Sequence, residues 1–231
     1  MRAVMRGILI SFLLVGGLLA SDSELEMARN KQDRAALDKI AGNLAAAAKA
    51  APKDADAQFH AALAAGYQAE VAIELKDKVG AKNAADAGIT FAEKAIELQP
   101  KNAENYRVLA TLCGQVVPAN PLAGMAYGKR AKEAITKALE LNPKSPDVHL
   151  AEGVGNYYLP AMLGGGPELA AKNFNEAIAL DPKCADAYLW LGLTLRKLHK
   201  NPEARQAFAK SVELNPHRIW AKDQLEKTPA Q

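Results

Sequence analysis

Apolar residues recur at helical spacing along most of this chain, and short polar segments interrupt them at intervals. Five segments close with a proline that follows a stretch of the form small-apolar-x-Leu-x or a near variant: Pro52, Pro100, Pro143, Pro182 and Pro216. Four of these prolines are followed by a lysine, a short residue, alanine or proline, and then an acid. Because proline ends one helix and an acid favours the first turn of the next, the pattern predicts a repeated series of helices.

The spacing of the prolines places these helices. Successive prolines are 48, 43, 39 and 34 residues apart, so the first three repeats exceed the last by 14, 9 and 5 residues. We expect these extra residues to form extended turns between the two helices of each repeat. The predicted all-α chain has an opening helix at about 23–50, helix pairs at 55–99, 103–142, 146–181 and 185–215, and a closing helix at 217–227.

Two stretches rich in proline and glycine, 118–121 and 159–167, are predicted to be such turns. The glycines at 164–166 could also offer backbone amides to a phosphate at the start of a helix. No Gly-Lys-Ser/Thr follows them and no strand is predicted before them, so a turn between helices is the favoured interpretation.

The last repeat carries a recognisable set of small and large residues at fixed spacing: Tyr188, Leu191, Gly192, Ala204, Phe208 and Pro216. This set resembles the tetratricopeptide repeat (TPR), whose period is 34 residues. Ser211 departs from the pattern, which has alanine there. The resemblance implies a right-handed superhelical solenoid of antiparallel helix pairs, with small residues where two helices cross closely.

A narrower resemblance involves the final third of the chain. The segment 163–167, followed by a helix and then the segment 192–199, is similar to the C-terminal part of the regulator of microtubule dynamics family. This second resemblance implies a helical scaffold of the same type.

In the TPR proteins that this chain resembles, the first helix of each pair lines a concave groove. The positions that point into the groove give a mixed set, apolar in the middle and basic at two places. The candidate groove residues are Phe59, Leu63, Tyr67, Arg107, Thr111, Leu150, Val154, Tyr157, Leu189, Arg196 and Lys197. The alternative for the apolar members is packing against the neighbouring helix.

Two functions fit this architecture. The first is a non-catalytic adaptor that binds a partner peptide or helix in the groove, burying apolar side chains while Arg107, Arg196 or Lys197 holds a carboxylate. The second is a small-ligand-binding TPR protein of a periplasmic solute transport system. A closed apolar cavity lined from Tyr67, Tyr106 and Tyr157 would favour the small ligand, and an open trough would favour a polypeptide.

Charge and composition argue against other classes. The formal charge is +3, the lysines and arginines are spread along the helices, and aromatic residues make up 6% of the chain, so we expect no nucleic-acid partner. The four histidines lie in different repeats and no catalytic or metal motif is present, so we expect neither an enzyme nor a cofactor. Cys113 and Cys184 are expected to be two free thiols.

The N-terminal sequence has the pattern of a secretory signal and predicts that the protein is exported. Arg2 and Arg6 precede an almost wholly apolar run from Gly7 to Leu19, and Ala20 offers a small residue for cleavage. We expect a signal peptide at about 1–20, a periplasmic or secreted protein, and no stable membrane span after cleavage. An uncleaved N-terminal anchor is the alternative.

Overall fold

The computed structural model describes residues 23–117 and 121–230, and this part of the chain is helical without a strand. The expected signal segment at 1–20 lies outside it. A helix at 23–30 comes first. The other elements are α2 (Arg34–Ala50), α3 (Ala55–Glu74), α4 (Lys78–Leu98), α5 (Ala103–Val116), α6 (Pro121–Leu141), α7 (Pro146–Tyr158), η2 (Ala161–Leu163), α8 (Pro167–Leu180), α9 (Ala185–Lys197), α10 (Asn201–Leu214) and α11 (Ile219–Lys227).

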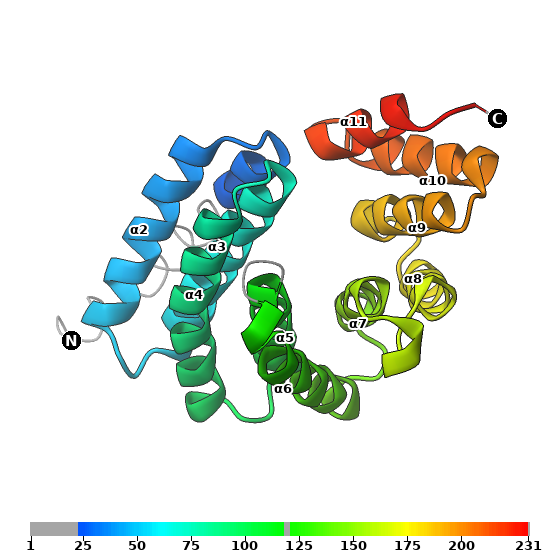
Figure 1. Cartoon of the computed structure of the whole chain (residues 1–231). Helices are drawn as coiled ribbons and strands as arrows, with labels where there is room; N and C mark the ends of the chain where they lie inside the picture. The colour runs from blue at the N-terminus through cyan, green and yellow to red at the C-terminus, as the bar shows by residue number, and fades with distance from the viewer. Residues whose placement is uncertain (1–22, 118–120, 231) are drawn as a thin grey trace, which may run out of the picture.

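The helices form antiparallel pairs that stack into a helical-repeat solenoid. Extensive packing contacts join helices that are neighbours or next neighbours along the chain. In Figure 1 the first helices α5, α7 and α9 lie on the inner side of the curve, and the second helices α6, α8 and α10 lie outside. The four pairs begin and end within two residues of the ranges expected from the sequence.

Local chemistry explains where the first helices begin. Each follows a Pro-Lys turn, and in α3, α5 and α7 a short polar side chain then caps the new helix, whereas α9 begins after Cys184 without a side-chain cap. Asp54 accepts hydrogen bonds from two backbone amides of α3, Asn102 accepts one from Glu104 (3.0 Å), and Ser145 accepts one from Val148 (3.2 Å). These caps satisfy amides that have no partner inside the helix.

The opening region differs from the single helix expected at 23–50. The helix at 23–30 stops, and Gln32 adopts a left-handed conformation with φ of 53°. Asp33 then caps α2 by accepting from the amide of Ala36 at 3.0 Å. Since asparagine, aspartate or glycine usually marks such a break, a glutamine at the left-handed position gave no signal.

The extra residues of the first repeat also differ from the expectation of an extended turn. Helices α3 and α4 have 20 and 21 residues, against 13 and 14 in α9 and α10. Each is therefore seven residues longer, which accounts for the whole surplus of 14. Seven residues make about two helical turns, so the added length keeps the same face toward the partner helix.

The next two repeats place their surplus differently. In the second repeat most of it lengthens α6, which has 21 residues. In the third repeat α7 and α8 have the same lengths as α9 and α10, and all five extra residues lie in the connection at 159–166, which contains η2. Only this third surplus forms the extended turn predicted from the sequence.

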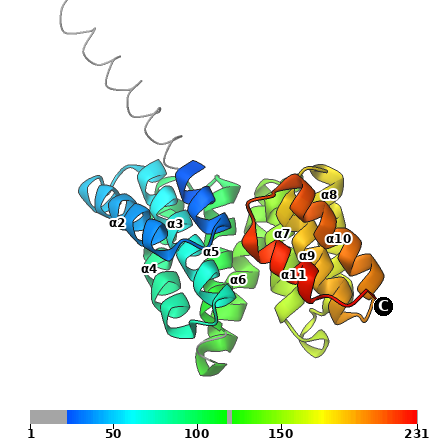
Figure 2. The ribbon, with the colours of Figure 1, turned by 90° about the horizontal axis from the view of Figure 1, so that it is seen from above.

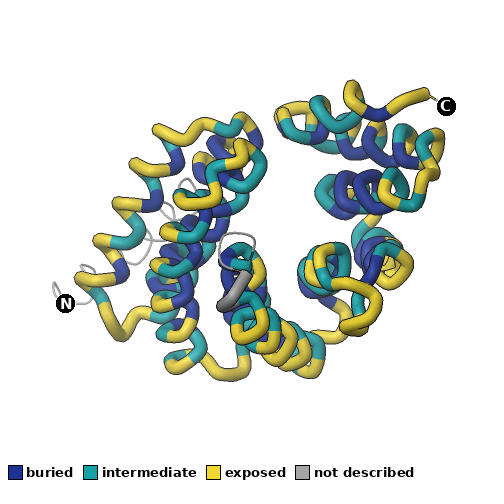
Figure 3. The backbone as a smooth tube through the Cα atoms, in the orientation of Figure 1, coloured by how far each residue is buried: buried dark blue, intermediate teal, exposed yellow. Residues whose placement is uncertain are grey.

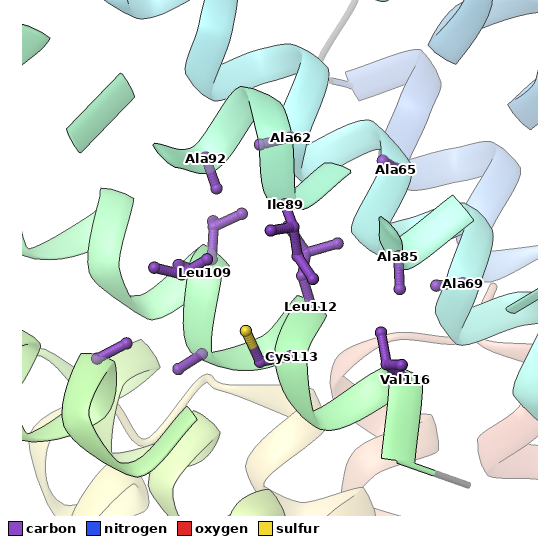
Figure 4. Close-up of a cluster of buried hydrophobic side chains, with 13 residues drawn as sticks. Ala62, Ala65, Ala69, Ala85, Ile89, Ala92, Leu109, Leu112, Cys113 and Val116 are labelled. Carbon is purple, nitrogen blue, oxygen red and sulfur yellow. The ribbon is translucent and has the colours of Figure 1, made fainter. Parts of the chain in front are cut away.

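The buried side chains form separate cores. One cluster lies among α3, α4, α5 and α6, and includes Leu112 and Val116 (Figure 4). A second joins the helix at 23–30 to α2 and α3 through Leu25 and Leu37. A third lies among α7 to α11 around Phe174. We call residues 23–141 the N-terminal lobe and residues 146–227 the C-terminal lobe; they stand side by side in Figure 2.

Candidate functional site

The first helix of each pair lines the inner side of the solenoid. Its opposite side packs on the second helix of the pair. We use the name inner face for the surface carried there by Leu63, Tyr67, Arg107, Thr111, Val154, Tyr157 and Tyr158. Figure 3 shows that buried backbone follows the contacts between paired helices, while the sides turned away from them are partly open. Of this set, Tyr158 is exposed and the other six are half-buried.

The structure divides the predicted groove residues into three kinds. Phe59, Leu63, Leu150 and Val154 are half-buried and pack against the cores of their own lobes with part of their surface. Thr111 is also half-buried, and its hydroxyl donates to the carbonyl of Arg107 at 3.1 Å. Part of each of these side chains is therefore exposed, and a ligand could cover it.

Two other predicted groove residues have contacts that stabilise the fold. Leu189 is fully buried in the core of the C-terminal lobe. Arg196 donates to Gln224 at 2.6 Å and to Thr228 at 3.2 Å, so its guanidinium ties α9 to the closing helix α11 and to the residue that follows it. These two bonds use one N–H group on each terminal nitrogen of Arg196, and a carboxylate-binding role for this residue stays a prediction.

The two other predicted cations remain near the inner face. The Nε of Arg107 donates to Glu104 at 2.5 Å, and no described residue bonds its two terminal nitrogens. Burial alone would lower the pKa of Arg107, and Glu104 raises it above the ordinary value. Lys197 is exposed, donates to the carbonyl of Tyr157 at 2.8 Å, and lies 4.5 Å from the centre of that residue's ring.

An aromatic group lies where α7, α9 and α11 meet. The ring centres of Tyr157 and Tyr158 are 5.6 and 6.0 Å from that of Trp190, which lies 5.4 Å from that of Trp220. Tyr158 is 54% exposed, and the pKa of its hydroxyl is raised to about 12. Partial burial of the hydroxyl is the main cause, and Tyr157 contributes next. The carboxylates Glu70 and Glu74 on α3 contribute less.

Five charged side chains from four separate parts of the chain meet where the two ends of the solenoid approach each other. We call Arg29, Glu70, Glu74, Asp186 and Arg218 the clasp. Arg29 forms a bidentate pair with Glu70 at 2.7 and 2.8 Å and bonds Asp186 at 2.7 Å. Arg218, just before α11, reaches across to the N-terminal lobe and bonds Glu74 bidentately and Glu70 at 2.8 Å.

The clasp is shielded from water. The side chains of Arg218 and Glu74 are 0% and 1% exposed, and those of Glu70 and Asp186 are 18% and 21% exposed. Burial raises the pKa of Glu74 above its ordinary value, although Arg218 opposes this. Burial alone would also raise the pKa of Asp186, but Arg29 and Arg218 bring it below its ordinary value. Three carboxylates thus share two guanidinium groups in a poorly solvated site.

A hollow of about 220 Å³ lies elsewhere, among α2, α3 and α4. Its polar walls are already paired: Asp38 accepts from Gln68 at 2.7 Å, and Arg34 bonds Asp77 at 2.8 Å. None of the predicted groove residues lines it. The hollow is therefore distinct from the inner face.

Other features of the described residues bear on chemistry. Cys113 and Cys184 are both free thiols, and burial raises the pKa of each to about 11. No three acidic, histidine or cysteine side chains in the described part of the chain are grouped to hold a metal. None of the helices between residues 23 and 230 that the structure describes is long and apolar enough to cross a membrane.

Sequence reasoning missed the clasp. Members that bond each other are up to 157 residues apart along the chain, as for Arg29 and Asp186, so no local spacing connects them. Asp186 could be explained as a first-turn acid of its helix, and Arg218 as one charge of an amphipathic closing helix. The one available signal was that Glu70 and Glu74 lie four residues apart and therefore share a face of α3.

Comparison with known proteins agrees with this fold. A thermophilic TPR protein from Thermus thermophilus has a TM-score of 0.63 at 18% identity, over 89% of this chain and 99% of that one. The HusA haemophore of Porphyromonas gingivalis has a TM-score of 0.56 at 19% identity, over 74% of this chain and 92% of that one. At these identities the likeness concerns the fold alone.

Relatives in sequence are more specific. Regulator of microtubule dynamics protein 2 of Bos taurus is 36% identical over 93 residues, which are 40% of this chain and 22% of that protein. The match thus spans about a fifth of that relative's length. The model of the family "Regulator of microtubule dynamics protein 1-3" matches residues 24–227, far more than the final third in which the resemblance was recognised. The chain therefore belongs to the regulator of microtubule dynamics protein 1-3 family.

Proposed function

We propose that this chain is a non-catalytic interaction scaffold that holds a segment of a partner protein on its inner face. The observation that carries the proposal is Tyr158. It is 54% exposed, although it belongs to an aromatic group, and the other Phe, Tyr and Trp residues between 23 and 230 are more fully buried. Exposed tyrosines beside tryptophan are typical of the residues that contribute most to protein interfaces.

The neighbouring residues suit a peptide. Leu150 and Val154 lie on the same helix as Tyr158 and keep part of their apolar surface open. Lys197 has ammonium protons beyond the one used on Tyr157, and no hydrogen bond to a described residue uses the terminal nitrogens of Arg107, which also attracts Asp147. A segment with apolar side chains and a carboxylate would match both kinds of contact.

A small-molecule carrier is the second candidate, and the clasp is the observation that favours it. Because the clasp ties the two ends of the solenoid together, it restricts entry to the inner face and suits a compact ligand. The likeness in fold to a haemophore is compatible with this candidate.

The two candidates are separated by crosslinking from the inner face. Benzoylphenylalanine replaces Tyr158 in the full chain, and the control carries it at Met125, which is 86% exposed on α6. We expect one discrete polypeptide joined to position 158 and absent from position 125.

A synthetic peptide of the crosslinked segment completes the test. We expect it to bind the wild-type chain, and Val154→Asp to weaken that binding about tenfold or more by placing a charge among apolar contacts. Glu133→Lys, an exposed change on α6, should leave binding unchanged. Failure of Val154→Asp to weaken binding would overturn the inner face as the site. A small molecule carried by the isolated chain in native mass spectrometry would favour the second candidate.

We also propose that the chain acts outside the cytoplasm, on the basis of the apolar segment at 7–19 that follows two arginines. N-terminal sequencing of the chain from cell fractions tests this. A start near residue 21 in the exported fraction supports cleavage and export, and an intact chain in the cytoplasmic fraction contradicts them.

A further inference from the structure

The two lobes have independent cores. The apolar clusters among the helix at 23–30 and α2 to α6 share no residue with the cluster among α7 to α11. Each lobe therefore buries its own apolar surface, and moving one lobe relative to the other exposes little of either core. This is the architecture of two bodies that a few contacts hold together.

The lobes meet on one side through the chain connection at 142–145. Of the three contacts between successive repeats, this one between the second and the third is the least extensive. A hydrogen bond of 3.4 Å from Ser145 to Glu104 crosses it. A short connection with limited packing is the usual location of a hinge between rigid units.

The clasp is on the other side of the inner face. Arg218 and Asp186 belong to the C-terminal lobe, while Arg29, Glu70 and Glu74 belong to the N-terminal lobe. Every bond of Arg218 to Glu70 or Glu74, and the bond of Arg29 to Asp186, crosses between the lobes. In Figure 1 the start of α11 accordingly lies beside the region of α3.

The chemistry of these bonds makes closure reversible. A buried ion pair gains Coulomb energy but loses hydration of both partners, so its net contribution is small compared with apolar packing of the same size. When the lobes separate, water solvates the same five charges. The closed and open forms are then close in free energy, and a ligand that prefers one of them shifts the balance.

We infer that the clasp is a releasable gate: the lobes rotate about the connection at 142–145, and breaking the bonds of Arg218 to α3 opens the inner face to its partner. The identity of the ligand that enters rests on the proposed function, whereas the opening motion of the lobes is independent of it. A partner that binds the open inner face pulls the equilibrium toward release. Closure around a bound segment then slows its dissociation.

The motion is tested without any ligand. Cysteines at Lys39 on α2 and Gln206 on α10, both exposed, carry spin labels in the full chain with Cys184→Ala, while buried Cys113 does not react. Arg218→Glu places a fourth carboxylate in the clasp. Breaking a buried pair in this way is expected to change the ratio of closed to open forms about 100-fold or more. The distance distribution should move to a longer separation.

A matched control and a rescue make the result specific. Arg130→Glu makes the same charge change in an ion pair with Glu93 inside the N-terminal lobe, and it should leave the distance unchanged. Glu74→Arg added to Arg218→Glu restores a pair of opposite charges across the lobes and should recover part of the short distance. If Arg218→Glu loses its helix content, Glu70→Gln, which removes one charge at nearly constant size, replaces it.

Each outcome decides a separate question. A folded clasp variant with an unchanged distance overturns the gate, whatever binds. A longer distance in the clasp variants alone supports the gate. If the lobes open but the crosslinker at position 158 captures no discrete polypeptide from either the closed or the opened chain, the gate stands and the proposed function fails. If the crosslink yield rises with opening, both stand.

Discussion

The two lobes differ in the residues that they place where the two helices of a repeat cross. In the C-terminal lobe a glycine on the first helix faces a phenylalanine on the second. A β-carbon added to Gly153 would lie 2.5 Å from the ring of Phe174, and one added to Gly192 would lie 2.6 Å from that of Phe208. Both phenylalanines are fully buried. The ring lies directly on the backbone of the facing helix, where glycine alone fits.

The N-terminal lobe uses smaller partners at the equivalent positions. Ala110 replaces the glycine in the second repeat and Ile135 replaces the phenylalanine, while Ala62 and Ala92 occupy the same two positions in the first repeat. As the first-helix residue grows from glycine to alanine, the second-helix residue shrinks. The second, third and fourth repeats thus have a similar summed volume at the crossing, whereas the first repeat has alanine at both positions and a smaller total.

The largest expected effect comes from removing the ring. Phe174→Ala and Phe208→Ala should each lower the free energy of unfolding by about 3–5 kcal/mol, because the cavity has backbone on one side and collapses poorly. Ile135→Ala in the N-terminal lobe should cost less, about 2 kcal/mol, since this residue is only half-buried. Denaturant unfolding followed by helix content measures both. Equal losses in the two lobes would contradict the difference in packing.

Glycine replacement gives a sharper test within one helix. Gly153→Ala should destabilise the protein by about 1–3 kcal/mol through the clash with Phe174. Gly155→Ala, two residues further on α7 with no neighbour within 4 Å of its added β-carbon, should instead stabilise it by up to about 1 kcal/mol. Thermal melts of the two variants should move in opposite directions.

A double substitution tests the volume constraint directly. Gly153→Ala with Phe174→Ile reproduces the combination found in the second repeat. We expect it to be more stable than the sum of the single changes, by about 1 kcal/mol or more, because the two residues contact each other. Additive effects would show that the size of one partner does not determine the other.

The smallest expected effect is a change of stability with pH that comes from Cys113 in the core of the N-terminal lobe. Burial raises the pKa of Cys113 from 9.0 to about 11, so the unfolded chain releases this proton at lower pH than the folded one. Stability from this group is therefore lost as pH rises from 9 toward 11, by about 1.4 kcal/mol at pH 10. Comparing wild type with Cys113→Ala at pH 7.5 and pH 10 isolates the contribution. The same pH dependence in both would remove Cys113 as its source.

Much of the solenoid could be predicted because its signals are local. Proline followed by lysine ends the second helices α4, α6 and α8, and a short polar residue starts the next pair at α5 and α7, within a few residues of that proline. The lengthened helices could not be located in this way. The surplus in the first repeat consists mostly of helix-forming residues that continue the pattern, so nothing in the sequence distinguished added helical turns from an extended turn.

The candidate site was less predictable than the fold. TPR geometry correctly favours half-buried positions such as Leu63 and Tyr157, but it carries no information about the segment after the last repeat. The closing helix supplies Gln224, which takes up Arg196, and it begins just after Arg218, which joins the clasp. Such contacts depend on how far the solenoid curves, and curvature is the sum of small rotations that no single residue specifies.

The two-turn extension of α3 and α4 has a consequence for how this chain can change in length. Insertions or deletions of seven residues within these helices rotate the remainder by only about 20° relative to its partner, whereas changes of one or two residues turn the apolar face away. The connection at 159–166 has no such restriction, since its residues need not keep a helical phase. Viable length variants of this molecule should therefore come in steps of about seven residues in the first repeat and in any number in the third.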